Sequence, residues 1–160
     1  MSNATPLITF IASDPDAKIP QYQTAGAAGA DLACVLRDQR GQILRDGITL
    51  APMERRLIDT GLRLDIPDGF EVQVRPRSGL ALKHGLTVLN SPGTIDSDYK
   101  GPLMVLLCLL GSEPYTIHHG DRIAQMVMAP VTRFTAATRP NLEGLSESDR
   151  GDRGFGSTGR

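Results

Sequence analysis

The chain has 160 residues, with 17 Lys and Arg against 18 Asp and Glu, so its formal net charge is -1. This length suits one domain with its own core. Proteins that bind nucleic-acid duplexes usually carry a strong excess of basic residues, and this chain does not. Any phosphate ligand should therefore be a small molecule. With 17 Gly, 11 Pro and only 4% aromatic residues, the composition indicates many turns and few helices.

The sequence shows no pattern typical of secretion or of membrane insertion. The first 20 residues lack the basic start and apolar core of a signal peptide, and no apolar run reaches the roughly 18 residues that span a bilayer. We therefore expect a cytoplasmic protein with no membrane partner. Cys34 and Cys108 lack Cys or His neighbours at zinc-ligand spacing, so both are expected to be reduced, buried packing residues.

Short strand-like segments, separated by turns, run along most of the chain. The first strand is expected over residues 7–11, just before two prolines. Between residues 37 and 65, Gly, Asp-Gly and Pro turn signals recur at the spacing of a sandwich or barrel. Residues 70–75 alternate apolar and polar side chains, which predicts a strand with one buried face and places Arg75 on its wet side.

The second half of the chain continues this all-β pattern with one interruption. A single helical turn is expected over residues 80–84, with Ser78 as its N-terminal cap and Gly85 at its end. The run Leu103–Leu110 is apolar without alternation, so a strand there should be covered on both faces. A central sandwich strand and a strand at a subunit contact explain that run equally well. Residues 123–131 are the last clear strand.

Residues 139–160 differ in composition from the body of the chain. They are polar and Gly-rich, with Phe155 as their single aromatic residue. Such a segment cannot form a core by itself. We therefore divide the chain into a β-domain over residues 1–138 and a flexible C-terminal tail over residues 139–160.

The segment RPRSGLA, residues 75–81, combines features that suit an anion site. Arg77 could fork onto phosphate oxygens, while the Ser78 hydroxyl and the backbone amides of Ser78 and Gly79 donate to them. Gly79 would let a ligand come close to the backbone. A solvated turn between a strand and a helix is an equally good explanation of the segment taken alone.

Five segments in order resemble the motifs of the homotrimeric dUTPases. They are AGADL (28–32), PRSG (76–79), NSPGTIDSDY (90–99), GDRIAQM (120–126) and RGDRGFGSTG (150–159). The resemblance implies a distorted jelly roll, or β-sandwich, of short strands that assembles as a homotrimer. It implies hydrolysis of dUTP to dUMP and pyrophosphate, which limits uracil incorporation into DNA and supplies dUMP for thymidylate synthesis. It also implies Mg²⁺ as cofactor, held by substrate phosphates and water.

The resemblance assigns the base and sugar site to residues 90–99. Asp96 orients and deprotonates the attacking water, whereas Asp98 is better explained as a turn carboxylate that bonds its own backbone. The Tyr99 ring packs under the deoxyribose and excludes UTP. The uracil edge is recognised by the Asn90 side chain and by the backbone of Gly93, Thr94 and Ile95.

The resemblance divides the remaining site residues between the β-domain and the tail. In the β-domain, Asp31 orients Arg77 and faces the metal through water, and Gln125 contacts the phosphate region, although a strand glutamine on a wet face fits the pattern as well. Ala30 departs from a larger family residue. The resemblance builds each site from three subunits: residues 28–32, 76–79 and 120–126 come from one, residues 90–99 from a second, and the tail, which closes over the site, from a third. In the tail, Arg153 replaces a usual glycine. Its substrate-binding residues are Arg150, Phe155, Gly156 and Ser157, with Thr158 adding a second hydroxyl.

Two other functions share some of these features. A dCTP deaminase, or a bifunctional deaminase and dUTPase, has the same fold and a related Arg-Ser motif, but its catalytic glutamate is missing from this sequence. A non-catalytic dUTP-binding module would need the binding residues without Asp96. His84, His118 and His119 lie in no constellation with a nucleophile or paired acids, so we expect turn or surface histidines.

Overall fold

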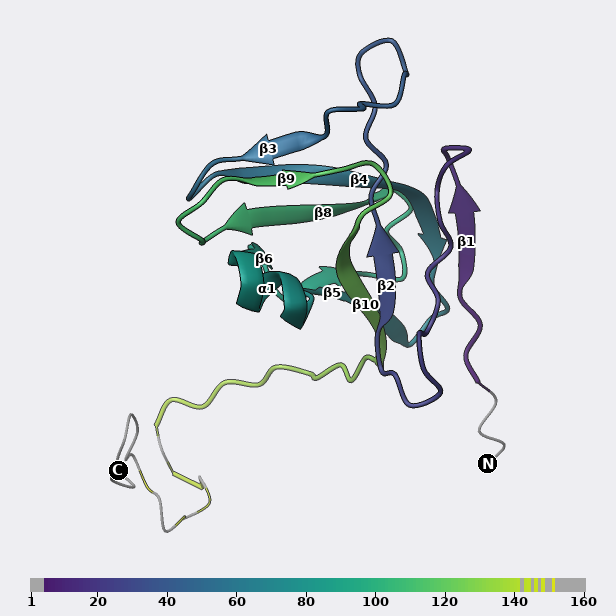
Figure 1. Cartoon of the computed structure of the whole chain (residues 1–160). Coiled ribbons are helices and arrows are strands. Elements are labelled where there is room, and N and C mark those ends of the chain that lie inside the picture. The colour runs from purple at the N-terminus through teal and green to yellow at the C-terminus, as the bar shows by residue number, and fades with distance from the viewer. Residues whose placement is uncertain (1–4, 142, 145, 147, 149–150, 152–160) are drawn as a thin grey trace.

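The computed structural model describes residues 5–141, 143–144, 146, 148 and 151. Within them lie ten strands and one helix, arranged as a two-layered sandwich (Figure 1). The elements are β1 (Thr9–Ala12), β2 (Ala30–Ala33), β3 (Ile48–Leu50), β4 (Arg55–Asp65), β5 (Phe70–Arg75), α1 (Ser78–His84), β6 (Leu86–Val88), β7 (Gly93–Ile95), β8 (Pro102–Leu109), β9 (Tyr115–Ile117) and β10 (Arg122–Pro130). The all-β fold class predicted from the sequence is confirmed.

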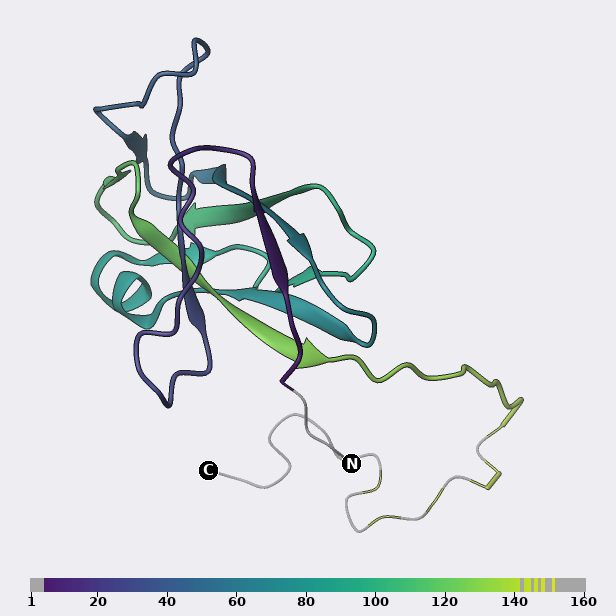
Figure 2. The same ribbon diagram turned by 90° about the vertical axis from the view of Figure 1, so that its right-hand side faces the viewer.

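Two four-stranded sheets form the layers, in the orders β1-β4-β8-β6 and β2-β10-β5-β7, and β3 pairs with β9 in a small third sheet. All of these strand pairs are antiparallel. The two main layers are seen edge-on in Figure 2. Apolar side chains from both layers meet in one core, among them Leu32, Val72, Val74 and Ala124 from one sheet and Ile58, Leu62, Val105 and Leu107 from the other.

The apolar strand β8 is fully covered on only one face within the chain. Leu103, Val105 and Leu107 are buried, but Met104 between them is half-buried. On the neighbouring strand, the Leu57 side chain is 53% exposed. The outer face of this sheet therefore keeps apolar surface that none of the described residues covers.

The helix α1 begins earlier than the sequence pattern suggested. Its N-cap is Arg77, whose backbone is extended, and Arg77 provides no side-chain cap hydrogen bond. The Arg77 carbonyl accepts the backbone N–H of Ala81 at 3.0 Å, so Ser78 is already inside the first turn. The prediction that Ser78 caps the helix is therefore wrong. Gly85 ends α1 with φ of 70°, as predicted, because a left-handed cap costs glycine little.

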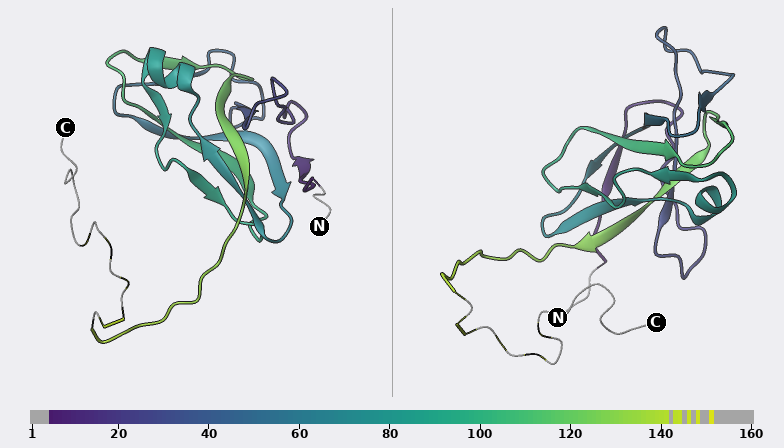
Figure 3. Two further views of the ribbon diagram at one scale, coloured as in Figure 1. Left: turned by 90° about the horizontal axis from the view of Figure 1, so that it is seen from below. Right: turned by 90° about the vertical axis from the view of Figure 1, so that its left-hand side faces the viewer.

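Beyond β10 the chain leaves the sandwich, and residues 131–141 extend away from it (Figures 1 and 3). Phe134 in this stretch is 89% exposed. The proposed boundary at residue 138 stays a prediction. The tail residues Arg150, Arg153, Phe155, Gly156, Ser157 and Thr158 lie outside the described residues. Among the residues that are described, no helix has both the length and the hydropathy to cross a membrane.

Candidate active site

The carboxylate of Asp31 holds two arginines from different parts of the chain. Arg77 donates from Nε to Asp31 Oδ1 at 3.1 Å, and Arg122 donates from Nη1 to Asp31 Oδ2 at 2.9 Å. Arg77 also donates from Nη1 to the Arg122 carbonyl at 2.8 Å. The Asp31 side chain is only 16% exposed, whereas that of Arg122 is 51% exposed. Two guanidinium groups around one carboxylate leave a surplus positive charge at the surface, which suits an anionic ligand.

Sequence reasoning missed Arg122, although it lies inside the GDRIAQM motif. The turn before it is tightly held, since Asp121 Oδ2 accepts the His118 backbone N–H at 2.8 Å and the Asp121 carbonyl accepts the Cys34 N–H at 2.9 Å. This turn delivers Arg122 to the first position of β10, opposite Ala33 of β2. An arginine directly after a Gly-Asp turn and before an apolar strand was the available signal.

Gln125 braces the turn that carries Arg77. Its Nε2 donates to the Pro76 carbonyl at 3.0 Å. On the other side, a Cβ on Gly29 would come within 2.3 Å of Gln125 Oε1, so a larger residue there would displace this side chain from its present position. Gln125 is thus engaged with the protein rather than left on a wet face. Its direct contact with phosphate stays a prediction.

Ser78 and Gly79 follow Arg77 at the start of α1 and face open space. Outside its own helix backbone and chain neighbours, a Cβ added to Gly79 would meet no atom of the described residues within 4 Å, and its φ does not require glycine. The packing of the chain therefore gives no internal reason for glycine at this position. Close approach of a ligand to the backbone would supply one. Ala30, where the sequence departs from a larger family residue, is buried and pairs with Met126 of β10.

The hairpin that contains Asn90 and Gly93 lies along the other edge of β5. Gly93 pairs with Val74 and Ile95 pairs with Val72. The Asn90 side chain folds over Gly93, because a Cβ there would lie 3.2 Å from Asn90 Nδ2. The structure thus brings together the residues predicted to recognise a uracil edge.

Asp96 and Tyr99 line a hollow of about 280 Å³ next to this hairpin. The Tyr99 backbone N–H donates to the Asp96 carbonyl at 3.1 Å, and Tyr99 Oη donates to the Pro102 carbonyl at 3.1 Å. The Tyr99 ring lies against Gly101, where a Cβ would come within 2.5 Å of Tyr99 Cζ. The result is a mainly apolar hollow with one carboxylate, formed by Leu57, Thr94, Ile95, Asp96, Tyr99, Pro102 and Met104.

The arginine cluster and the Asp96 hollow lie at opposite ends of β5. Ile95 pairs with Val72, so Asp96 follows at the end where β5 begins, whereas Arg77 lies beyond Arg75 at the other end. Glu71 and Arg75 are four residue steps apart along the strand, which is about 13 Å at roughly 3.3 Å per step, and Arg77 is further still. Within one chain, the proposed base and the proposed phosphate site are therefore too far apart to act on one phosphate group.

Comparisons with known proteins agree on one family. Residues 15–159 match the family model described as dUTPase. The deoxyuridine 5'-triphosphate nucleotidohydrolase of Dinoroseobacter shibae is 54% identical over 149 residues, which cover 92% of each chain. A mutant dUTPase of Staphylococcus bacteriophage 80alpha, solved with dUpNHpp, aligns with a TM-score of 0.78 at 24% identity over 96% of this chain and 99% of that one. A mutant dUTPase from phage phi11 of S. aureus, solved with a structural Mg(II) ion, aligns with a TM-score of 0.70 at 21% identity over 86% of this chain and 99% of that one. The chain therefore belongs to the dUTPase family.

Proposed function

We propose that this protein hydrolyses dUTP to dUMP and pyrophosphate, with Asp96 as the base that activates water for attack on the α-phosphorus. The 54% identical relative is named for this substrate, and it matches nearly the whole chain. Asp96 lies at the rim of a hollow that also has Tyr99 in its wall. A carboxylate at the edge of an apolar hollow can accept a proton from a water held beside the bound nucleotide.

The triphosphate binds to the cluster around Arg77. Ser78 and Gly79 offer a hydroxyl and two amides on the open side of the turn, and Arg77 is held in position by Asp31. We add Arg122 to this set, because it shares the Asp31 carboxylate and is half exposed. Charge-assisted bonds from two oriented arginines match the distribution of negative charge on a triphosphate.

The hollow beside Asp96 receives the deoxyribose, and the Asn90 hairpin receives the uracil. The Tyr99 ring, fixed by Gly101 beneath it and by the bond to the Pro102 carbonyl, forms the wall against the sugar. A 2'-hydroxyl would meet this apolar wall without a partner, which disfavours UTP.

The separation of Asp96 from Arg77 along β5 is the observation that supports a site shared between chains. A base must come within about 3 Å, or one water molecule, of the group it serves. The two halves can meet only if Asp96 of one chain faces Arg77 of another. Apolar side chains on the outer sheet face that lie outside this hollow, such as half-buried Leu106, provide surface for such contacts. We propose a homotrimer, with Arg150 and Phe155 of a third chain closing each site.

Magnesium fits this site only as an ion held mainly by the substrate. Among the described residues, no three His, Cys, Asp or Glu side chains converge to hold a metal. Both oxygens of Asp31 already accept bonds from arginines. Mg²⁺ commonly keeps several waters and binds through substrate phosphates. When bound, it would offset phosphate charge and orient the leaving group.

The decisive experiment compares Asp96→Asn with its neighbour Asp98→Asn. Pyrophosphate release is measured with dUTP, dTTP, UTP and dCTP. We expect the wild-type protein to prefer dUTP. Asp96→Asn should lower kcat by about 10² to 10⁴ with little change in dUTP binding, and Asp98→Asn should stay near wild type. If Asp96→Asn also turns over dUTP at nearly the wild-type rate, Asp96 is not the base. Formation of uracil nucleotides from dCTP would favour the deaminase.

A further inference from the structure

The phosphate-holding turn continues into a helix that has little support of its own. α1 has seven residues, and none of them is buried. A helix this short is far below the length at which isolated helices become stable in water. Whatever fixes the positions of Ser78 and Gly79 must therefore come from contacts between α1 and other elements.

The C-terminal end of α1 is seated on the loop between β8 and β9. The Leu110 backbone N–H donates to the Gly85 carbonyl at 2.9 Å. Gly111 lies so close to the helix end that a Cβ there would come within 2.2 Å of the His84 carbonyl oxygen. Only backbone fits in this gap, so the loop supports the end of α1 by direct contact.

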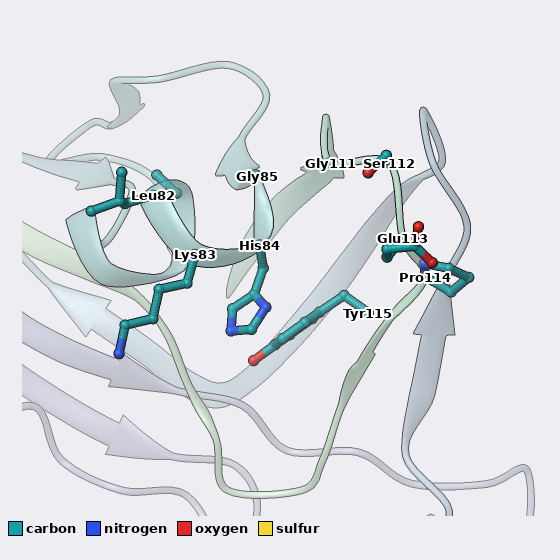
Figure 4. Close-up of a pocket in the computed structure, with 10 residues that line it drawn as sticks. Leu82, Lys83, His84, Gly85, Gly111, Ser112, Glu113, Pro114 and Tyr115 are labelled. Atoms are coloured by element: carbon teal, nitrogen blue, oxygen red, sulfur yellow. The ribbon is translucent and has the colours of Figure 1, made fainter.

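The one aromatic ring contact found among the described residues lies at the same end of the helix. The His84 and Tyr115 rings have centroids 4.5 Å apart and planes tilted by 42°. Figure 4 shows the two rings pointing toward one another, with Lys83 on the same side of the helix. They lie in a pocket of about 350 Å³. Tyr115 belongs to β9 and pairs with Leu50 of β3, so the ring that His84 meets comes from a sheet.

Tyr115 is also within electrostatic reach of the arginine cluster. Burial and, to a smaller extent, the charge of Asp121 raise the pKa of Tyr115, while the charge of Arg77 opposes this shift. Tyr115 thus contacts the last residue of α1 through its ring, and its pKa responds to the charge of the arginine that precedes the helix.

We propose that the His84–Tyr115 contact is an anchor that positions α1, and with it the turn Arg77–Gly79, for the triphosphate. This inference rests on the proposed role of that turn in phosphate binding. His84 and Tyr115 touch no substrate in this scheme, so they act as positioning residues. Losing the contact should weaken binding of the phosphates without changing recognition of uracil or deoxyribose, because the base hairpin is held by its own pairing with β5.

The test distinguishes the loss of the aromatic ring from a change of residue that keeps it. It also distinguishes binding of the triphosphate from binding of the nucleoside. Tyr115→Leu removes the ring, and Tyr115→Phe keeps it. Affinity is measured for an imido-bridged dUTP analogue by titration and for deoxyuridine by competitive inhibition. Tyr115→Leu should weaken binding of the analogue about 2- to 10-fold, the range for one aromatic contact, and leave deoxyuridine unchanged. Tyr115→Phe should match the wild-type protein for both ligands.

A second pair of variants covers the case in which Tyr115→Leu fails to fold. His84 lies at the end of an exposed helix, so His84→Ala should keep the core intact and reproduce the selective loss, and His84→Phe should restore binding. Equal weakening of analogue and deoxyuridine, or no weakening in either ring-deleted variant, overturns the anchor. Ser78→Ala tests the underlying assignment separately: if it leaves analogue affinity unchanged, the phosphate role of the turn is wrong and the anchor falls with it.

Discussion

Mixed assemblies of Arg77→Ala and Asp96→Asn chains should recover activity that neither variant has alone. In one chain the two residues lie at opposite ends of β5, more than about 13 Å apart along the strand. A shared site is intact when its Arg77 comes from an Asp96→Asn chain and its Asp96 from an Arg77→Ala chain. In randomly mixed closed trimers at equal amounts, this holds for about a quarter of the sites. Activity should therefore approach about a quarter of the wild-type value.

The assay is pyrophosphate release from dUTP across a series of mixing ratios, after the chains have been unfolded and refolded together. Native mass spectrometry of tagged chains confirms that mixed assemblies form. A matched control mixes Arg77→Ala with Ser78→Ala. Both changes lie in the same turn, so every site in every mixed trimer has a mutated phosphate-binding turn. This control should show no activity beyond the weighted sum of its two parent variants at any ratio. If mixed assemblies of Arg77→Ala and Asp96→Asn form and stay equally inactive, both residues serve the same site from one chain and the shared site is wrong.

Three further predictions follow from individual contacts. Gly29→Ala should push the Gln125 side chain off the turn before Arg77, because the new Cβ would lie 2.3 Å from Gln125 Oε1. With dUTP as substrate, we expect kcat/KM to fall about 2- to 10-fold, which corresponds to the loss of one hydrogen bond. Met53 has φ of 67° and is 72% exposed. Met53→Gly should raise the free energy of unfolding by about 0.5–1 kcal/mol in urea titrations, whereas Met53→Ala, which keeps the strain, should not. The Arg37 guanidinium lowers the pKa of Asp14 from 3.8 to about 2, against a smaller opposing effect of burial. The stability from this pair is present above about pH 4 and is lost as the pH falls from there toward 2. In Arg37→Met, the free energy of unfolding in urea should therefore depend less on pH between 4 and 2. An unchanged pH dependence in that range would count against the pairing.

Local patterns in the sequence were enough to predict the fold class and most of the element types. The alternation over residues 70–75 is a property of six adjacent side chains, and β5 has those bounds. Gly85 ends α1 as predicted, since the left-handed cap depends on that residue alone. The role of Ser78 was predicted wrongly, because the N-cap is Arg77, one residue before the predicted cap, and its carbonyl accepts the first bond of the helix. Helix starts depend on backbone bonds that the pattern of side chains leaves undetermined.

Motifs in the sequence identified which residues to consider, but only the tertiary structure showed which of them meet. Asp31 and Arg122 are 91 positions apart and come together because β2 pairs with β10 in one particular register. The register of β5 and β7 likewise decides that Asp96 and Arg77 lie at opposite ends of a strand. A shift of one residue would turn every side chain of a strand to the other face, so these distances depend on the packing of the whole sandwich. The sequence by itself determined the chemistry available to this protein, and the strand register decided that one chain holds it in two separate halves.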